Sequence, residues 1–449
     1  MQFVFVDNYR GFSNTLIPIK SVNFLVGENS TGKTSILALL KLLSPLTLWF
    51  QSDFDARDVG LGAFKDIVSV GAPDSSYFSV GIVFDEPKAI EAENKNDGNA
   101  GEPKTVGTSP AAHVMTFTEG EGMPRLSSIV SYRDGLEIRI KYVGNSVRYK
   151  YRNELHDCSA EQFADTHLRN WVNLQKSDRG GYTILKNDRH FINVNVPPIS
   201  LFNYLRNVII EKKSKSGVGL SGIPSFPGDI IWLAPIRSKP RKTYDEYNIA
   251  FSPEGDHTPY LIKKNLASSS KSNGFKGFLD EVGEKSGLFK KIEIKNYGRG
   301  TSAPFELDVV LSKEPLDVSS VGYGVSQALP VIVEMFTRPK HSWFAIQQPE
   351  VHLHPKAQAA LGEIFFKLAS TENKRFIVET HSDYTIDRYR ISCRRSERSV
   401  DAQVLFFERG ESGNKVTPIP IDDGGNFSGE QPAGYRAFFI KEEMELLGL

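Results

Sequence analysis

The sequence predicts an α/β fold in which an antiparallel β-subdomain and a largely helical or irregular insertion interrupt a domain of alternating strands and helices. Three observations predict this fold. A strand, a glycine-bounded loop and a helix stand near the start, short β-rich runs separated by turns fill residues 60–150, and alternating strands and helices return after residue 300. The return of the alternation indicates that one α/β domain is split by a long insertion.

The composition is that of a globular protein and narrows the function classes. The chain has 449 residues, of which 40% are hydrophobic and 24% charged, and this excludes disorder throughout. Its 54 basic and 54 acidic side chains balance, so a nucleic-acid partner would need a local basic patch. Two cysteines are too few for a disulfide framework or a thiolate zinc site. No apolar run reaches the ~18 residues of a membrane span and no signal-peptide pattern opens the chain, so we expect a cytoplasmic protein without a membrane partner.

The first 50 residues predict a phosphate-binding unit. Phe3–Val6 and Val22–Val26 are β-rich runs, and a helical spacing of apolar residues then continues as far as Ser44-Pro45, because proline disfavours the helical conformation in the residue before it. Between the second strand and the helix, Gly27–Thr34 satisfies G-x-x-x-x-G-K-[ST]. Such a loop wraps phosphates with its N–H groups, while its lysine supplies charge and its threonine offers a hydroxyl to Mg²⁺.

The middle of the chain predicts an antiparallel sheet followed by the insertion. Tyr77–Phe84, Leu136–Ile140 and Val147–Tyr151 are β-rich runs bounded by turns. We therefore expect an N-terminal lobe with the phosphate loop and this sheet at 1–150, and an inserted helical or irregular region at 151–230. A C-terminal lobe is expected at 231–400 and a small α/β extension at 401–449.

Three polar clusters follow one another in the C-terminal lobe. Ser319–Gln327 is a loop of glycine and serine before an apolar helix, which is a second candidate anion site. The apolar strand Trp343–Ile346 runs into the polar stretch Gln347–Pro355, and a later strand, Phe376–Val378, runs into Glu379-Thr380-His381-Ser382. The order along the chain is thus phosphate loop, glycine-serine loop, strand with a polar end, and strand ending near a histidine.

This order and spacing resemble the ATP-binding-cassette (ABC) ATPases, in the branch that contains RecF, the SMC heads and the overcoming-lysogenization-defect (OLD) ATPases. Asn8–Phe12 is similar to the opening motif of that branch and Val321–Gln327 to its signature loop. Pro349–Pro355 is similar to the Walker B and D-loop stretch of OLD-type members, and Val378–Ser382 to their switch-histidine strand. The stretches at 232–237 and 421–426 also resemble stand-alone ATPases of bacterial anti-phage operons, those of the PARIS type among them.

The resemblance implies a P-loop ATPase head that uses ATP and Mg²⁺, and it assigns roles residue by residue. The implied nucleotide-binding residues are Arg10, Gly27, Glu28, Asn29, Ser30, Thr31, Gly32, Lys33, Thr34 and Ser35. The implied catalytic positions are Gln347, Gln348, Glu350 and His381, with Thr34 and Gln347 at the metal. The implied signature loop, which completes the site of a facing subunit, comprises Gly322, Tyr323, Gly324, Ser326 and Gln327.

The chain departs from the family pattern at Gln347, where members carry an acid. A neutral amide cannot act as a general base and is a poorer anchor for Mg²⁺. The sequence therefore predicts impaired hydrolysis, and it predicts that Gln347→Glu raises phosphate release without tightening ATP binding. Members often have Glu-Gln-Pro-Glu here, so Gln348 fits the pattern, and Glu350 is the nearest remaining carboxylate.

Other clusters have simpler interpretations. Glu350, His352 and His354 alternate and would share one face of a strand as metal ligands, but the D-loop interpretation explains the same residues. The basic clusters at 237–242 and 388–398 are candidates for nucleic-acid contact, although a solvated face balanced by nearby acids is favoured. Asp422-Asp423 is followed by glycines and predicts a turn.

Two function classes follow from the resemblance. The favoured one is a nucleotide-switched ATPase that pairs head to head as a homo-oligomer, at least a dimer, and holds a toxic effector until a phage trigger protein is sensed. Too few residues follow His381 for the Toprim nuclease domain of OLD nucleases, so a Toprim-type nuclease effector would be a separate partner. The alternative is a repair ATPase of RecF or SMC type whose dimer clamps DNA. Nucleic acid is therefore a possible partner that the sequence does not favour.

Overall fold

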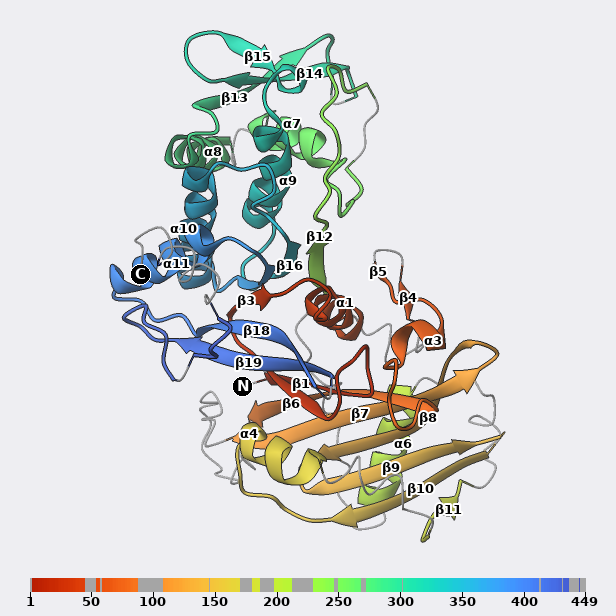
Figure 1. Cartoon of the computed structure of the whole chain (residues 1–449). Helices are drawn as coiled ribbons and strands as arrows, with labels where there is room; N and C mark the ends of the chain where they lie inside the picture. Colours follow the sequence, from red (N-terminus) through yellow and green to blue (C-terminus); the bar gives the residue numbers. More distant parts are fainter. Residues whose placement is uncertain are drawn as a thin grey trace, which may run out of the picture. The chain divides into compact units, whose positions relative to one another are not determined.

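The computed structural model describes residues 2–44, 54–56, 59–87, 108–144, 146–169, 180–185, 198–211, 229–245, 249–267, 272–300, 302–411, 413–429, 431–435 and 444. These residues form two compact units. Unit 1 comprises Met1–Ile19, Pro45–Phe226 and Arg409–Val416, and unit 2 comprises Lys20–Ser44, Pro227–Glu408 and Thr417–Leu449. The α/β class predicted from the sequence is confirmed, because unit 1 is built on an antiparallel sheet and unit 2 on a mainly parallel sheet with helices (Figure 1).

Unit 1 is built on an eight-stranded sheet whose neighbouring strands all pair antiparallel. In spatial order its strands are β11 (Thr183–Ile184), β10 (Ser146–Asn153), β9 (Leu136–Val143), β8 (Met123–Arg133), β7 (Thr108–Gly120), β6 (Tyr77–Pro87), β1 (Gln2–Asp7) and β2 (Thr15–Ile19). The remaining elements are β4 (Asp55–Ala56), β5 (Val59–Gly60), α3 (Phe64–Ile67), α4 (Ala160–Phe163), the π-helical turn η1 (Ala164–Leu168) and α6 (Pro198–Glu211).

The three β-rich runs predicted from the sequence in this region are strands β6, β9 and β10. In the same sheet, residues on one face of β1, β7 and β8 pack into a core with α4. That core includes Phe5, Val114, Val130, Tyr132 and Phe163. The Tyr132 and Phe163 rings stack with their centroids 4.5 Å apart, so α4 is attached to the sheet through aromatic contact.

Apart from residues 409–416, which are counted with unit 1, the six-stranded sheet in the order β12-β16-β17-β3-β18-β19 belongs to unit 2. The strands are β12 (Ile230–Leu233), β16 (Trp343–Gln347), β17 (Arg375–Glu379), β3 (Val22–Gly27), β18 (Ala402–Gly410) and β19 (Gly413–Ile421), and the first five are parallel. Its helices are α1 (Lys33–Leu43), α7 (Thr258–Ala267), α8 (Ser272–Ser286), the 3₁₀ turn η2 (Val318–Ser320), α9 (Tyr323–Thr337), α10 (Pro355–Glu372) and α11 (Asp383–Arg394). A second, three-stranded sheet consists of β13 (Lys291–Asn296), β14 (Phe305–Val310) and β15 (Pro315–Asp317).

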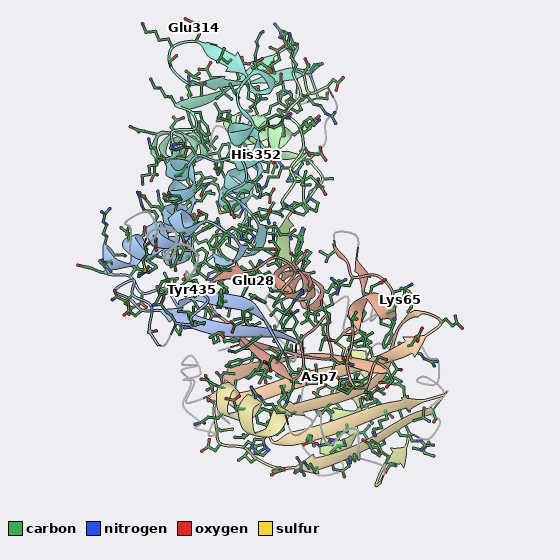
Figure 2. The ribbon with its side chains drawn as sticks, in the orientation of Figure 1. Asp7, Glu28, Lys65, Glu314, His352 and Tyr435 are labelled. Carbon is green, nitrogen blue, oxygen red and sulfur yellow. The ribbon has the colours of Figure 1, made fainter. Side chains whose placement is uncertain are left out.

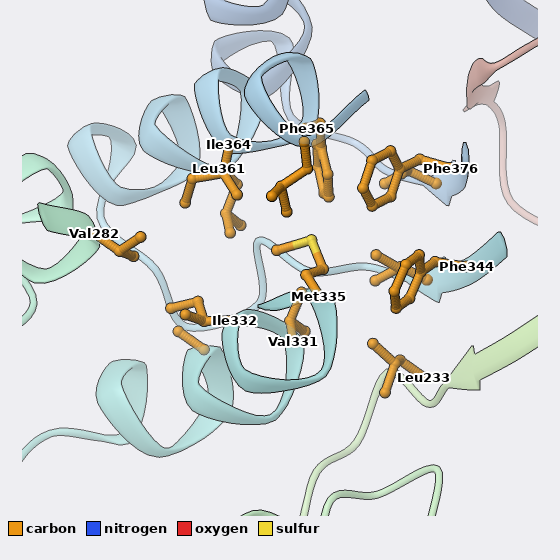
Figure 3. Close-up of a cluster of buried hydrophobic side chains, with 14 of the residues drawn as sticks. Leu233, Val282, Val331, Ile332, Met335, Phe344, Leu361, Ile364, Phe365 and Phe376 are labelled. Atoms are coloured by element: carbon orange, nitrogen blue, oxygen red, sulfur yellow. The ribbon is translucent and has the colours of Figure 1, made fainter. Parts of the chain in front are cut away.

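The core of unit 2 lies between the parallel sheet and the helices α8, α9 and α10. Figure 3 shows the side chains of α9 and α10 facing one another and the rings that β16 and β17 contribute. Phe344 and Phe376 are fully buried, and their rings stack at 5.3 Å. This packing fixes β16 beside β17, which sets the positions of the polar residues that follow each strand.

Local sequence explains where the unit 2 helices begin and end. Helix α10 begins with Pro355 after the N-cap His354 and ends at Glu372, followed by the C-cap Asn373 in the left-handed conformation. Helix α1 ends at Leu43 with Ser44 as its C-cap, at the place that the Ser44-Pro45 pair predicts. None of the helices in the described part of the chain has the length and apolarity needed to cross a membrane.

Candidate nucleotide site

The candidate site lies at the carboxyl ends of three neighbouring parallel strands of unit 2. Strand β17 lies between β3 and β16, with Glu379 opposite Leu25 of β3 on one side and opposite Gln347 of β16 on the other. Parallel strands end at the same edge of a sheet, which is where open α/β sheets bind ligands. The Gly27–Thr34 loop, the polar end of β16 and the polar end of β17 are therefore brought together within one unit.

The phosphate loop has backbone conformations that require glycine at its start. Gly27 has φ +140°, and a Cβ placed there would lie 2.0 Å from the carbonyl oxygen of Phe407 on β18. Gly32 is the N-cap of α1 and has φ 91°. Because it has no side chain, the N-cap residue makes no hydrogen bond to the first N–H groups of the helix. A helix N-terminus without a side-chain cap presents N–H groups and a positive dipole end to an anion.

Lys33 and Thr34 direct their polar groups toward the loop and the neighbouring strand. The Lys33 Nζ donates to the carbonyls of Gly27 at 2.9 Å and Glu28 at 2.6 Å. Burial lowers the pKa of Lys33, and the charges of Glu379 and Glu28 oppose that change. The Thr34 Oγ1 lies 3.0 Å and 2.9 Å from the two carboxylate oxygens of Glu379. The loop thus carries the cation and the hydroxyl that phosphate and Mg²⁺ binding require.

The Glu379 carboxylate was missed as a site residue by the sequence reasoning. It ends β17, is only 5% exposed, and accepts hydrogen bonds from the Thr34 hydroxyl and from the Gln347 Nε2, the latter at 3.2 Å. In the sequence Glu379 appears only as a neighbour of the switch histidine. Its local sequence does not distinguish it from any other acidic residue that follows a strand. Its importance follows from the strand order, which places it between the phosphate loop and the end of β16.

The predicted catalytic positions at the end of β16 are held by hydrogen bonds within unit 2. Besides its bond to Glu379, Gln347 accepts at its carbonyl from the Arg237 Nη2 at 3.0 Å. The Gln348 N–H donates to the Glu379 carbonyl at 2.8 Å, and Gln348 has φ 41°. Arg237 is buried, and its Nε and Nη1 have no hydrogen-bond partner among the described residues. Burial lowers the pKa of Arg237 to about 10, against the nearby charge of Glu350.

Glu350 and His381, two of the predicted catalytic residues, contact one another in the structure. The His381 N–H donates to the Glu350 Oε1 at 2.6 Å. Burial raises the pKa of Glu350, and this N–H opposes the change. A buried carboxyl group with a raised pKa is a candidate proton acceptor, because general bases work best with a pKa nearer the working pH.

The predicted signature loop divides into an exposed and a buried part. Gly322 and Tyr323 are exposed at the start of α9, whereas Ser326 and Gln327 are buried. The Ser326 hydroxyl donates to the Tyr323 carbonyl at 2.9 Å, and the Gln327 side chain bonds to the backbone of Arg237.

The second glycine of that loop, Gly324, lies near the D-loop stretch of the same chain. A Cβ on Gly324 would lie 3.0 Å from the His352 carbonyl oxygen, and the rings of Tyr323 and His352 have centroids 6.0 Å apart. The part of the loop that is available to another molecule therefore consists of Gly322 and Tyr323.

The remaining predicted nucleotide residues lie in both units. Glu28, which Figure 2 labels, is exposed together with Asn29 and Ser30, and the buried Thr31 donates to the Glu28 carbonyl at 2.7 Å. Ser35 lies in the first turn of α1. Arg10 belongs to unit 1, where its guanidinium donates to the carbonyls of Asp66 and Leu61. Its predicted contact with nucleotide stays a prediction.

The alternative clusters have structural roles. No group of three His, Cys, Asp or Glu side chains suited to a metal occurs in the described ranges. His354 accepts from the Lys356 N–H as a helix cap, and the Asp422 side chain accepts from the Asn426 N–H in the predicted turn. Arg390 and Arg394 donate to the carbonyls of that turn, so part of the basic cluster at 388–398 binds the chain itself.

The side chains at the strand ends fit a magnesium nucleotide. Mg²⁺ prefers oxygen ligands and takes one or two from the protein, together with phosphates and water. The Thr34 hydroxyl and the Glu379 carboxylate supply such oxygens within hydrogen-bond distance of one another, and Lys33 lies on the same loop.

Comparison with known families agrees with this geometry. The sequence model of the AAA ATPase domain matches residues 1–100 and 127–386. The chain belongs to the AAA ATPase domain family. The match includes the phosphate loop, the ends of β16 and β17, and His381, so the site described above lies in the ATPase domain itself. No curated protein sequence matches the chain.

Several solved structures are similar to this ATPase domain over most of their length. An SMC head bound to the C-terminal winged-helix domain of ScpA has a TM-score of 0.40 at 11% identity, covering 93% of this chain and 97% of that chain. The SMC head domain of Thermotoga maritima has a TM-score of 0.34 at 11% identity, with 93% and 99% covered. The recombination mediator RecF has a TM-score of 0.29 at 12% identity, with 92% and 97% covered.

Proposed function

We propose that the chain is a magnesium-dependent ATPase whose nucleotide state switches its pairing with a second copy. The observation that carries this proposal is the convergence of the Lys33 ammonium, the Thr34 hydroxyl and the Glu379 carboxylate at one sheet edge. It is supported by the loop geometry at Gly27 and Gly32 and by membership of an ATPase family.

Each residue has a role that follows from its position. The loop N–H groups and Lys33 would bind the β- and γ-phosphates, and Thr34 would contribute its hydroxyl to the metal. Glu350, with its raised pKa and its bond to the His381 backbone, is suited to accept the proton of the attacking water. Bound magnesium would neutralise charge that develops on the phosphates.

Nucleotide binding is tested by calorimetric titration of ATP with magnesium. We expect Lys33→Ala to abolish measurable binding, because the substitution removes the cation that faces the phosphates. Lys264→Ala is the matched control, since Lys264 is an exposed lysine on α7 of the same unit. Equal ATP affinity for wild type and Lys33→Ala would contradict the proposed site.

Pairing in trans is proposed from the exposed start of α9. In the resembled branch, a signature loop completes the nucleotide site of a facing subunit, and here Gly322 and Tyr323 are the exposed members of that loop. A Cβ on Gly322 meets no atom of the described residues within 4 Å, and its φ is −58°, so this position accepts a side chain without disturbing the described fold. Ser326 is buried and is a less suitable position to test.

Gly322→Arg separates pairing from folding. We expect mass photometry to show a dimer of the wild type at saturating ATP and a monomer of Gly322→Arg, because the new side chain occupies the surface that meets the partner. Gly277→Arg on α8 is the control, since Gly277 is exposed and a Cβ there also meets none of the described atoms within 4 Å. A wild type that stays monomeric at saturating ATP would refute pairing.

The holding of a toxic effector rests on the resemblance to anti-phage ATPases and stays a prediction. Its test is co-expression with the product of the neighbouring gene, followed by size-exclusion chromatography with ATP and with ADP. A complex that forms with ATP and separates with ADP supports the role of sensor and scaffold. The DNA-clamping alternative predicts instead a gel shift that weakens steeply with salt.

A further inference from the structure

The carboxylate that contacts the Thr34 hydroxyl of the phosphate loop comes from β17 and not from β16. The two oxygens of Glu379 lie 3.0 Å and 2.9 Å from the Thr34 hydroxyl. The residue that ends β16, Gln347, has a neutral amide, and this amide donates to the same carboxylate at 3.2 Å. Within the described residues of the site, Glu379 is thus the only acid that contacts the hydroxyl expected at the metal.

The strand order explains why this position is suited to the metal. β17 is the direct neighbour of β3, the strand that leads into the phosphate loop, whereas β16 is one strand further away. Glu379 lies opposite Leu25, two residues before the loop begins, and the Thr380 N–H donates to the Leu25 carbonyl at 3.1 Å. The backbone that carries the carboxylate is therefore fixed to the backbone that carries the loop.

The charge of Glu379 already acts on the phosphate loop. It is one of the two carboxylates that oppose the lowering of the Lys33 pKa by burial. The carboxylate is almost fully buried, and a buried anion is stable only with hydrogen bonds or a cation beside it. The Thr34 hydroxyl, the Gln347 amide and the nearby Lys33 supply those partners, and a magnesium ion would be a stronger one.

We propose that Glu379 replaces the missing Walker B acid, holding magnesium or one of its waters together with Thr34, while the Gln347 amide orients the carboxylate. The proposal rests on the proposed function, because it assumes that the loop binds magnesium and ATP. It assigns Glu379 to the metal and Gln347 to a positioning role. The amide at 347 is then complementary to the carboxylate at 379 and is not a defect.

Magnesium-dependent ATP affinity tests the assignment without measuring turnover. ATP is titrated into the full chain with magnesium and, separately, with EDTA. We expect magnesium to strengthen ATP binding to wild type. Glu379→Gln should reduce this magnesium-dependent gain in ATP affinity about 10–100-fold, as loss of a group that supports a metal does. Affinity in EDTA should stay at the wild-type value, because Lys33 and the loop N–H groups remain; this arm also shows that the variant is folded.

Two further variants make the result specific. Glu397→Gln removes one charge from an exposed position of the same unit and should leave both affinities unchanged. The double variant Gln347→Glu with Glu379→Gln exchanges the acid and the amide between the neighbouring strands. We expect this exchange to recover at least part of the magnesium-dependent gain, because a carboxylate again faces the site across the same hydrogen bond.

The outcomes separate this proposal from the proposed function. Glu379→Gln that keeps the full magnesium-dependent gain would overturn the assignment of Glu379, while ATP binding to the loop would stand. Wild type that binds no ATP under either condition would refute the proposed function itself. Loss of affinity in EDTA as well as in magnesium would show that Glu379 supports the loop and not the metal, and this also overturns the assignment.

Discussion

Gln347→Glu would place two buried carboxyl groups in contact. The Gln347 Nε2 lies 3.2 Å from the Glu379 Oε2, and the two residues are 7% and 5% exposed. At an effective dielectric constant of about 20, two unit charges at that separation repel by about 5 kcal/mol. This corresponds to a pKa raised by roughly 3–4 pH units for one member of the pair. We therefore expect the two carboxyl groups to share a proton near neutral pH.

The sign of the effect on stability follows from proton binding. In the unfolded variant both groups titrate near pH ~4.3, whereas the folded pair keeps one proton up to about pH 8. The folded state then binds more protons across this range, so the free energy of unfolding falls as the pH rises. Urea unfolding should show Gln347→Glu close to wild type at about pH 5 and several kcal/mol less stable at about pH 8.

A control and a refuting result complete the test. In the Glu379→Gln background the same substitution should show no such dependence on pH, because the second carboxyl group is gone. A stability difference that is the same at both pH values would mean that residues 347 and 379 do not face one another. Phosphate release, which the sequence alone predicted to increase in Gln347→Glu, should increase only where the second carboxyl group is ionised.

Three other substitutions test the core packing, the phosphate loop and a buried carboxylate of unit 2. Phe344→Ala should lower the free energy of unfolding by about 3–5 kcal/mol in urea titrations, because it empties a fully buried position between α9 and the sheet. Gly27→Ala should abolish ATP binding in calorimetry or prevent folding, since its Cβ would overlap the Phe407 carbonyl oxygen. Burial would raise the pKa of Glu334, but the bonds from His257 and Arg338 outweigh it and lower the pKa. Wild type should therefore lose stability as the pH falls below about 4.5, and Glu334→Gln should lose less over that range in the same urea titrations. An equal loss in both proteins would contradict the role of this carboxylate.

The phosphate loop could be predicted because its information is local. The strand, the glycines and the apolar spacing of the helix lie within 25 consecutive positions, 20–44, and the structure places β3 and α1 there. The antiparallel strands β6, β9 and β10 were predictable for the same reason, since a β-rich run bounded by turns is a property of each strand alone.

Features that depend on strand order or on which face is buried could not be predicted. Glu379 reaches Thr34 only because β17 lies between β3 and β16. The spacing of residues along the chain does not show which strands are neighbours in the sheet. Ser326 and Gln327 were grouped with the exposed Gly322, although the helix turns their side chains inward. Arg390 and Arg394 were noted in the sequence only for their charge, and their position does not reveal that they donate to the carbonyls of Gly425 and Gly424.

The place of β17 between the two motif strands affects how such chains are sorted into active and inactive enzymes. A classification that inspects only the residue at the end of β16 would place this chain among the pseudoenzymes, because it finds glutamine there. In this chain an acid on the adjacent strand lies within hydrogen-bond distance of that residue, so the strand end beside the phosphate loop has to be inspected as well. The usual acid-to-amide substitution that traps ATP has no target at position 347, and a trapping variant of this chain would be made at Glu350, because Glu379→Gln is expected to weaken magnesium-dependent ATP binding.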